Sequence, residues 1–425
     1  MRRAITAFLR LCLRIFFRRI ELLGMERVPG GRPVIFAVNH PNGLVDPLFL
    51  LCHAPAPVSF LGKAPLLGYP VIGYLARTFD MIPVYRKQDN SGGSNAETFS
   101  RARDVLRRGG SIAIFPEGTT HDDPKLRDLK TGAARIALGA ELEEELLVVP
   151  TGIYYTAKHV FRSSALVLFG EPLHVKPVPT DATGEPPVDD VEDLTAAIEA
   201  GLRSVTLQAD SHAALELVGR AEDIFTADDE QPLVEEFDLR RRFIDGYHYL
   251  RMRDPARLEK LQAAITQFEA ELRRAKLDVH ELRPEIDGVR LFRVLVLLPL
   301  ALLGAVISYP TYRLVGFLAH RLSKGERNVL ATMKFLGALA LYPLTYLAIA
   351  IVAGLRFGWL AGVVTALAVP FLGYIALYVF EEIDDVIGDL RAVGHRLFRK
   401  YGYTRLLAQR EAIRREMVEV AREMG

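Results

Sequence analysis

The chain has 425 residues, and its 53 lysines and arginines nearly cancel its 52 aspartates and glutamates, so net charge indicates no partner. Cys12 and Cys52 are its only cysteines, which makes a disulfide framework or a zinc site implausible and fits a reducing, cytosol-facing location. Charge is nevertheless segregated along the chain: arginine is frequent in the first twenty residues, and long stretches after residue 291 are almost uncharged. This pattern predicts a phospholipid membrane as partner.

Residues 1–24 are predicted to form a basic amphipathic helix at the membrane interface. From Ala4 to Leu23 apolar residues recur at helical spacing with arginines between them. Arginines beside Phe8 and Phe16 suit an anionic lipid surface better than a soluble core, although an ordinary packed helix is the alternative. Because arginine interrupts the apolar run and no small-residue cleavage site follows, the segment is not a secretory signal.

Residues 25–180 are predicted to form an α/β domain, a mixed sheet covered by helices. Apolar, strand-like runs alternate there with helix-like segments, and strands this apolar are buried on both faces. The expected strands are 34–38, 58–61, 112–115, 146–149 and 166–169, and the expected helices are 48–51, 96–108 and 131–140. Prolines and Gly184 then mark a linker at 176–205, where we expect the domain to end.

The remaining chain divides into a helical region and membrane segments. Residues 181–290 are rich in charged residues, leucine and alanine, with a bundled helix expected at 254–274, and their alternating charges indicate solvated faces. Residues 291–380 contain three apolar segments, and the last two are long enough for about 20 residues of span each. The first, 294–318, contains prolines, so we expect a bent or re-entrant hairpin. Basic residues between the first two segments favour the cytoplasmic side for that loop, and residues 381–425 are predicted to be an amphipathic helix.

Asn39 and His40 directly follow the expected strand 34–38, where loops of α/β proteins assemble sites. Asp46 comes six residues after the histidine, across a turn formed by Pro-Asn-Gly. A carboxylate that accepts from one ring nitrogen fixes the tautomer and raises the basicity of the other, which can then take a proton from an alcohol. On this motif alone, a capped turn without chemistry remains the alternative.

A second strand ends in the run Phe115-Pro-Glu-Gly-Thr-Thr-His121 and repeats the geometry of the first. Gly118 allows backbone amides to approach a substrate closely. The residues around it supply donors or acceptors for phosphate or carbonyl oxygen, and we take as substrate-binding candidates, together with Asn39, the residues Glu117, Gly118, Thr119, His121 and Lys130. Between the two runs, Lys63 and Arg86 follow irregular glycine- and proline-rich sequence and are predicted to bring two cations to one phosphate. A plain turn and a surface loop are the corresponding alternatives.

These runs, together with Val149-Pro150, resemble in their order the lysophospholipid and glycerolipid acyltransferase family. The resemblance implies a glycerol-3-phosphate acyltransferase-like fold and acyl transfer from acyl-coenzyme A or acyl carrier protein, with no cofactor and no metal. It implies that His40 deprotonates the acceptor hydroxyl and that Asp46 orients His40. Most members place four residues between the histidine and the aspartate, whereas five stand here, and Thr120 replaces the usual arginine after Glu-Gly-Thr.

Both departures look like the branch that acylates glycerol 3-phosphate or dihydroxyacetone phosphate. The alternative acceptor is 1-acylglycerol 3-phosphate (lysophosphatidic acid), which would yield phosphatidic acid. The implied protein is an integral membrane enzyme of phospholipid biosynthesis with its active site on the cytoplasmic face.

Other functions fit the sequence less well. The Gly-x-Ser-x-Gly nucleophile elbow of a lipid-directed serine hydrolase is absent from the sequence. Basic residues are interleaved with apolar runs and acidic helices rather than arranged as a stripe, so no nucleic-acid partner is expected. A non-enzymatic phospholipid-binding scaffold remains an alternative, and it predicts that lipid binding survives replacement of His40.

Overall fold

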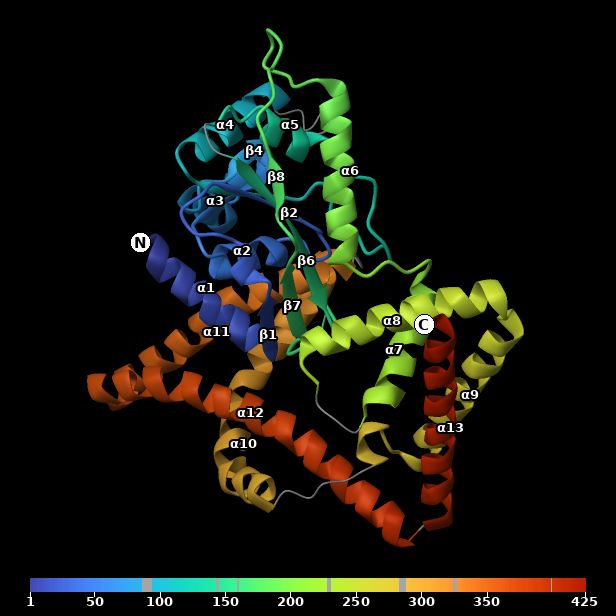
Figure 1. Ribbon diagram of the computed structural model, residues 1–425. Coiled ribbons are helices and arrows are strands. Elements are labelled where there is room, and N and C mark those ends of the chain that lie inside the picture. The colour runs from blue at the N-terminus through green and yellow to red at the C-terminus, as the bar shows by residue number, and fades with distance from the viewer. Residues whose placement is uncertain are drawn as a thin grey trace. The chain divides into compact units, whose positions relative to one another are not determined.

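The computed structural model describes residues 1–85, 94–142, 145–158, 160–227, 231–282, 288–323, 327–398 and 400–425. The chain divides into two compact units (Figure 1). The first comprises Met1–Asp210 with Gly325–Thr332, and the second comprises Ser211–Lys324 with Met333–Gly425. Each unit is described separately below.

The first unit is built on a mixed sheet, as the sequence predicts, and this sheet has eight strands among the described residues, three more than expected. The strand order is β1-β7-β6-β2-β5-β3-β4, and β8 also pairs with β6. The pairs of β6 with β7 and β8 are antiparallel, and all other pairs are parallel. The strands are β1 Arg19–Leu23, β2 Val34–Val38, β3 Val58–Lys63, β4 Ile82–Val84, β5 Ser111–Ile114, β6 Leu146–Tyr155, β7 Ser164–Phe169 and β8 Leu173–Val175. β2, β5 and β6 are almost wholly buried, as their apolar sequences require.

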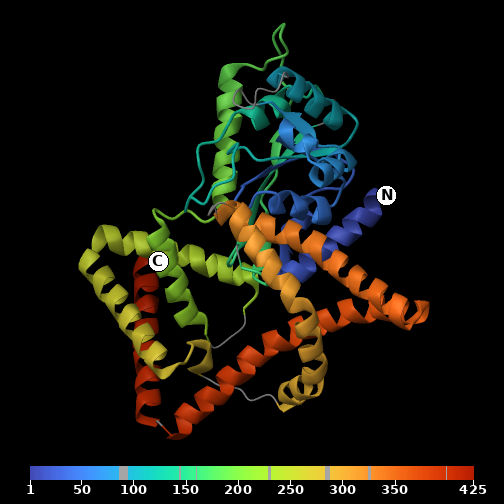
Figure 2. The same cartoon turned by 180° about the vertical axis from the view of Figure 1, so that it is seen from behind.

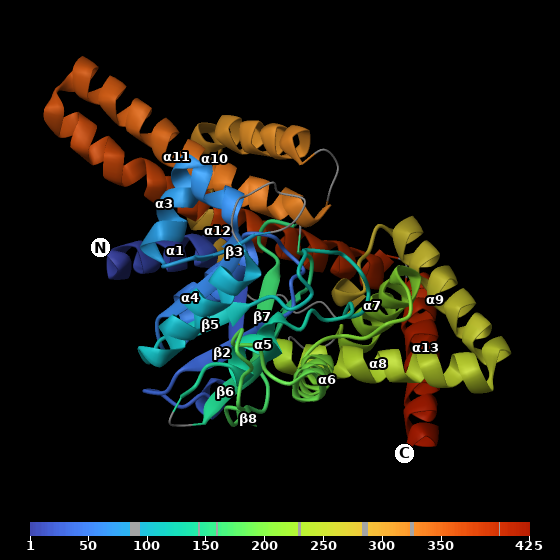
Figure 3. The same ribbon diagram turned by 90° about the horizontal axis from the view of Figure 1, so that it is seen from above.

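Helices cover this sheet on both faces (Figure 3). Right-handed crossovers place α2 and α3 on one face, and α4 and α5 on the other, because the chain reverses its direction across the sheet after β4. Helix α1 packs against α2, and α6 packs against α5 and β6. The helices of this unit are α1 Arg2–Phe16, η1 Met25–Arg27, α2 Val45–His53, η2 Ala64–Gly68, α3 Pro70–Thr78, α4 Asn95–Arg107, α5 Gly132–Leu138 and α6 Val188–Ser204.

The N-terminal prediction is wrong for its last residues. The helix α1 ends at Phe16, and residues 19–23 form the edge strand β1, parallel to β7. Their apolar residues alternate with Arg19 and Glu21, which pair with each other at 3.0 Å, and this period of two suits a charged edge strand. Helix α1 itself is amphipathic, since one face is buried while Phe8, Leu11 and Ile15 are exposed.

The compact unit also extends beyond the boundary predicted at residue 180. Helix α6 begins within the segment that was predicted to be a linker, and it buries Ile198 and Leu202. Gly201 allows the helix to approach the sheet, because a Cβ there would lie 2.4 Å from the Pro150 ring. The unit therefore continues to Asp210.

The second unit is helical. α7, α8, α9 and α13 pack on one another, and their core includes Ile265, Phe268 and Ile413. The bundled helix predicted at 254–274 corresponds to α9. The helices after residue 210 are α7 His212–Thr226, α8 Leu233–Arg253, α9 Pro255–Ala275, η4 His280–Leu282, α10 Gly288–Leu322, α11 Arg327–Phe357, α12 Trp359–Phe398 and α13 Lys400–Met424. The first residues of α11, up to Thr332, belong to the first unit. The predicted C-terminal amphipathic region at 381–425 is thus divided between the end of α12 and α13.

Among the described residues, three helices are long and apolar enough to cross a membrane: Gly288–Leu322, Leu330–Phe357 and Trp359–Gly394. The first runs as a single helix through Pro299 and Pro310, so the bent or re-entrant hairpin predicted at 294–318 is wrong. The helix bends instead (Figure 2), and prolines are the usual cause of such bends because they remove a backbone hydrogen bond.

Candidate active site

The candidate site lies at the carboxyl ends of the parallel strands of the first unit. β2 pairs with both β5 and β6, so the residues that follow β2 and β5 meet at one edge of the sheet. Asn39 continues the pairing beyond the end of β2. Its side-chain amide donates to the Ile153 carbonyl at 3.1 Å and accepts from the Ile153 N–H at 2.7 Å. Asn39 therefore fixes the backbone just before His40 and uses its own amide to do so.

His40 and Asp46 form a hydrogen-bonded pair. The His40 Nδ1 lies 2.8 Å from Asp46 Oδ2, and the two side chains are 16% and 0% exposed. An ionised carboxylate only accepts hydrogen bonds, so Nδ1 carries the proton and Nε2 keeps its lone pair. Within the described part of the chain, no hydrogen bond is made to Nε2. The geometry thus brings the two predicted catalytic residues together and leaves the basic nitrogen available.

Two further donors hold the Asp46 carboxylate, and the sequence identified neither. The Asn42 N–H donates to Oδ2 at 2.7 Å, and the Tyr155 hydroxyl donates to Oδ1 at 2.6 Å. Burial, reinforced by the charge of Asp46, raises the pKa of Tyr155 well above its usual value, so its hydroxyl keeps its proton and remains a donor. The strand predicted at 146–149 continues, buried throughout, to Tyr155. Recognising this continuation in the sequence would have brought Tyr155 to the site.

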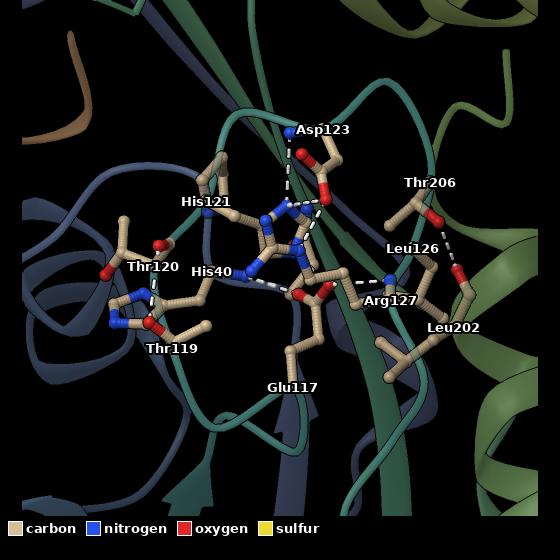
Figure 4. A network of polar contacts seen from close by, with 12 residues as sticks. His40, Glu117, Thr119, Thr120, His121, Asp123, Leu126, Arg127, Leu202 and Thr206 are labelled. Carbon is tan, nitrogen blue, oxygen red and sulfur yellow. Dashed lines mark hydrogen bonds and ion pairs between the residues drawn. The ribbon is translucent and has the colours of Figure 1, made fainter. Parts of the chain in front are cut away.

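Glu117 connects the two sequence motifs, as Figure 4 shows. Its Oε1 accepts from the His40 backbone N–H at 3.1 Å, and its Oε2 accepts from the Arg127 N–H at 3.1 Å and contacts the His121 ring. The His121 Nδ1 accepts from the Asp123 N–H at 3.2 Å, so the other ring nitrogen is the one that donates to Glu117. Glu117 and His121 are both buried. Their contacts hold the backbone on both sides of the site.

Phe115 forms one wall of the site. Its ring stacks on the His40 imidazole, with centroids 4.1 Å apart and an angle of 22° between the planes. This contact, together with the Asp46 hydrogen bond, restricts rotation of the imidazole. A histidine held in this way is pre-oriented for proton transfer.

The other predicted binding residues are distributed around the same edge. Lys63 ends β3 and Lys130 lies beyond β5, and both side chains are exposed. Gly118 has a φ of +72° in the turn after β5, a conformation that favours glycine. The Thr119 hydroxyl donates to the Thr120 carbonyl at 3.4 Å. Arg86 lies outside the described residues.

No group of three histidine, cysteine, aspartate or glutamate side chains in the described ranges is arranged to hold a metal ion. The described site offers a histidine oriented by a buried carboxylate, with exposed lysines on the same sheet edge.

Comparison with known proteins gives two matches to protein families. Residues 19–154 match the family described as "Acyltransferase". This segment is an acyltransferase-family domain. Residues 225–425 match the "Glycerol-3-phosphate acyltransferase 2 C-terminal domain". The resemblance inferred from the motifs is confirmed, and the C-terminal match agrees with the glycerol-3-phosphate branch.

The relatives of this chain include proteins named for acylation of glycerol 3-phosphate and of 1-acylglycerol 3-phosphate. Glycerol-3-phosphate O-acyltransferase 2 of Saccharomyces cerevisiae is 27% identical over 59% of this chain and 37% of its own length. Glycerol-3-phosphate O-acyltransferase 1 of the same yeast is 26% identical over 78% of this chain and 58% of its own length. A chloroplast 1-acyl-sn-glycerol-3-phosphate acyltransferase of Arabidopsis thaliana is 27% identical over 33% of this chain and 38% of its own length. The chain therefore spans about four to six tenths of the yeast relatives.

Proposed function

We propose that this protein is a membrane-bound O-acyltransferase that moves a fatty acyl group from acyl-coenzyme A or acyl carrier protein to a hydroxyl of glycerol 3-phosphate or dihydroxyacetone phosphate. The observation that carries the proposal is the His40–Asp46 pair, in which Nδ1 is bound to a buried carboxylate and Nε2 is open. The acyltransferase-family domain and the names of the two yeast relatives support it.

In the proposed mechanism, His40 is the general base. Its Nε2 accepts the proton of the acceptor hydroxyl while the hydroxyl oxygen attacks the thioester carbonyl. The new C–O bond forms, the C–S bond breaks, and the leaving thiolate takes the proton from the imidazolium. Asp46 stabilises the positive charge that the ring carries between these two proton transfers. No covalent enzyme intermediate is required.

Lys63 and Lys130 are our candidates for binding the phosphate of the acceptor, because both are exposed and end or follow strands that end at the edge that carries His40. A phosphate-binding lysine would also accept lysophosphatidic acid, and the Arabidopsis relative bears the name of that activity. The C-terminal match favours glycerol 3-phosphate instead. Basic residues flanking the helices that could cross a membrane support a site on the cytoplasmic face.

The test uses the full chain purified in detergent, with palmitoyl-coenzyme A and each of the three radiolabelled acceptors. We expect His40→Ala to lower kcat by a factor of about 10² to 10⁴, the usual contribution of a general base. His174→Ala is the matched control, because His174 is an exposed histidine of β8 that pairs with Glu145. Circular dichroism and size exclusion establish that both variants are folded.

Undiminished turnover by His40→Ala would refute the mechanism. Turnover with lysophosphatidic acid alone would transfer the assignment to the alternative acceptor. A folded wild-type protein that binds phospholipid vesicles but acylates none of the acceptors would favour the non-enzymatic scaffold.

A further inference from the structure

The turn between His40 and Asp46 leads directly into α2. Leu44 is the N-cap residue of this helix, and Asp46 lies in its first turn. The first N–H groups of a helix have no partner within the helix, so they need an external acceptor. The position of Asp46 depends on how well this first turn is held.

The sequence around α2 cannot supply the usual cap for Leu44. The Leu44 side chain makes no capping hydrogen bond. In a capping box, a glutamate or glutamine three residues after the N-cap residue accepts from the N-cap N–H. Pro47 occupies that position and has no such acceptor. The acceptor must therefore come from elsewhere in the chain.

Thr332 supplies it. The Leu44 N–H donates to the Thr332 hydroxyl oxygen at 3.2 Å, a contact between residues 288 positions apart in the sequence. Thr332 is only 4% exposed, and the preceding Ala331 is fully buried. Both belong to the same compact unit as the sheet. Thr332 also lies at the start of Leu330–Phe357, one of the helices able to cross a membrane.

We propose that Thr332 is a positioning residue of the active site, through which the first residues of a membrane-spanning helix hold the catalytic turn. This inference rests on the proposed acyltransferase function. By fixing the Leu44 backbone, Thr332 fixes the first turn of α2, hence the Asp46 carboxylate and the imidazole bound to it. Its hydroxyl acts through these residues and not on the substrate.

The hydrogen bond to Thr332 also holds the longer turn between the histidine and the aspartate. Five residues separate His40 from Asp46 here. Gly43 has a φ of +43°, and Leu44 presents its N–H to Thr332 in the same turn. The longer turn is thus held at its end by a residue from α11.

The experiment compares Thr332→Val, which keeps the shape but removes the hydroxyl, with Thr332→Ser, which keeps the hydroxyl. Thr345→Val is the matched control in α11, because it removes a hydroxyl that pairs with Thr311 at 2.9 Å, away from the turn. All variants are assayed as the full chain in detergent. Hydrogen exchange of the peptide containing residues 41–46 is measured in parallel.

We expect Thr332→Val to lower kcat about tenfold with KM changed less than about twofold, because a misoriented base weakens the transition state more than substrate binding. Thr332→Ser should recover most of the activity, and Thr345→Val should resemble the wild type. The Leu44 amide should exchange faster in Thr332→Val alone.

Wild-type kcat in Thr332→Val would overturn the proposal, as would unchanged exchange in the 41–46 peptide. An equal loss in Thr332→Val and Thr332→Ser would also overturn it, because the hydroxyl would then not be the cause. Failure of the proposed function is distinguishable, since it would abolish turnover in the wild type and in Thr345→Val, while the exchange measurement would still report on the contact.

Discussion

Replacing Tyr155 with phenylalanine removes a single hydroxyl that supports the His40–Asp46 pair. This hydroxyl donates to Asp46 Oδ1 at 2.6 Å, and the aromatic ring also packs against Phe17 and Phe49. Phenylalanine preserves the ring contacts, so the change isolates the hydrogen bond. Asp46 would keep two of its three described donors, His40 and the Asn42 N–H.

The size of the effect follows from the burial of the carboxylate. Asp46 is fully buried, so water cannot replace the lost donor. A hydrogen bond to a charged group contributes about 1.5–3 kcal/mol, and about 1.4 kcal/mol corresponds to a tenfold change in rate. Part of this loss will appear as lower stability, because the carboxylate is under-paired in the resting protein as well. We therefore expect Tyr155→Phe to lower kcat roughly tenfold and the free energy of unfolding by about 1–2 kcal/mol.

The assay measures kcat and KM with glycerol 3-phosphate, together with thermal unfolding in detergent. Tyr154→Phe is the matched control: it removes a hydroxyl from the neighbouring residue of β6, whose side chain points to the opposite face of the sheet. A kcat within twofold of the wild type in both Tyr155→Phe and Tyr154→Phe would show that Asp46 does not depend on the Tyr155 hydroxyl, and it would refute this prediction.

Three further predictions concern other described contacts. Glu117→Gln presents an NH₂ group to backbone donors such as the His40 N–H, so kcat should fall at least about tenfold with a lower unfolding midpoint; an unchanged kcat would contradict the positioning role. Burial raises the pKa of Glu222 in α7 to about 7 despite its pairing with Arg240. The folded state therefore binds this proton more tightly than the unfolded state does. As the pH rises from about 4.5 to about 7, the wild type should lose up to about 3 kcal/mol of its free energy of unfolding relative to Glu222→Gln. Thermal unfolding of both proteins across this pH range measures the difference. A fluorophore on Phe8→Cys should shift to the blue on vesicles with anionic lipid more than on neutral vesicles; equal spectra would argue against an interfacial α1.

The central strands and the contact between His40 and Asp46 were predictable because their signals are local. The run from Val34 to Val38 is apolar throughout and forms a fully buried strand with these bounds. Asp46 is close enough to His40 in sequence for a turn to bring them together, and the structure has them in contact.

The supporting contacts were not predictable, because they join distant parts of the chain. The contacts of Tyr155 and Thr332 with the site can be recognised only once the sheet order and the position of the start of α11 are known. The strand at 19–23 was missed for a different reason. Its apolar residues continue the helical spacing of α1, and only pairing with β7 decides in favour of a strand.

The residues that support the turn from His40 to Asp46 lie far from it in the sequence, and this affects when the site can form during biosynthesis. Glu117 and Tyr155 lie 77 and 109 positions from the residues they hold, and Thr332 lies 288 positions from Leu44. Contacts of such long range form late, because each must close a long loop, and a chain on the ribosome cannot make them before their residues emerge. The turn from His40 to Asp46 is synthesised early but gains the Thr332 contact only when α11 has followed. The proposed activity should therefore reach its full level first in nascent chains that already contain the start of this helix, which would link the completion of the site to membrane insertion.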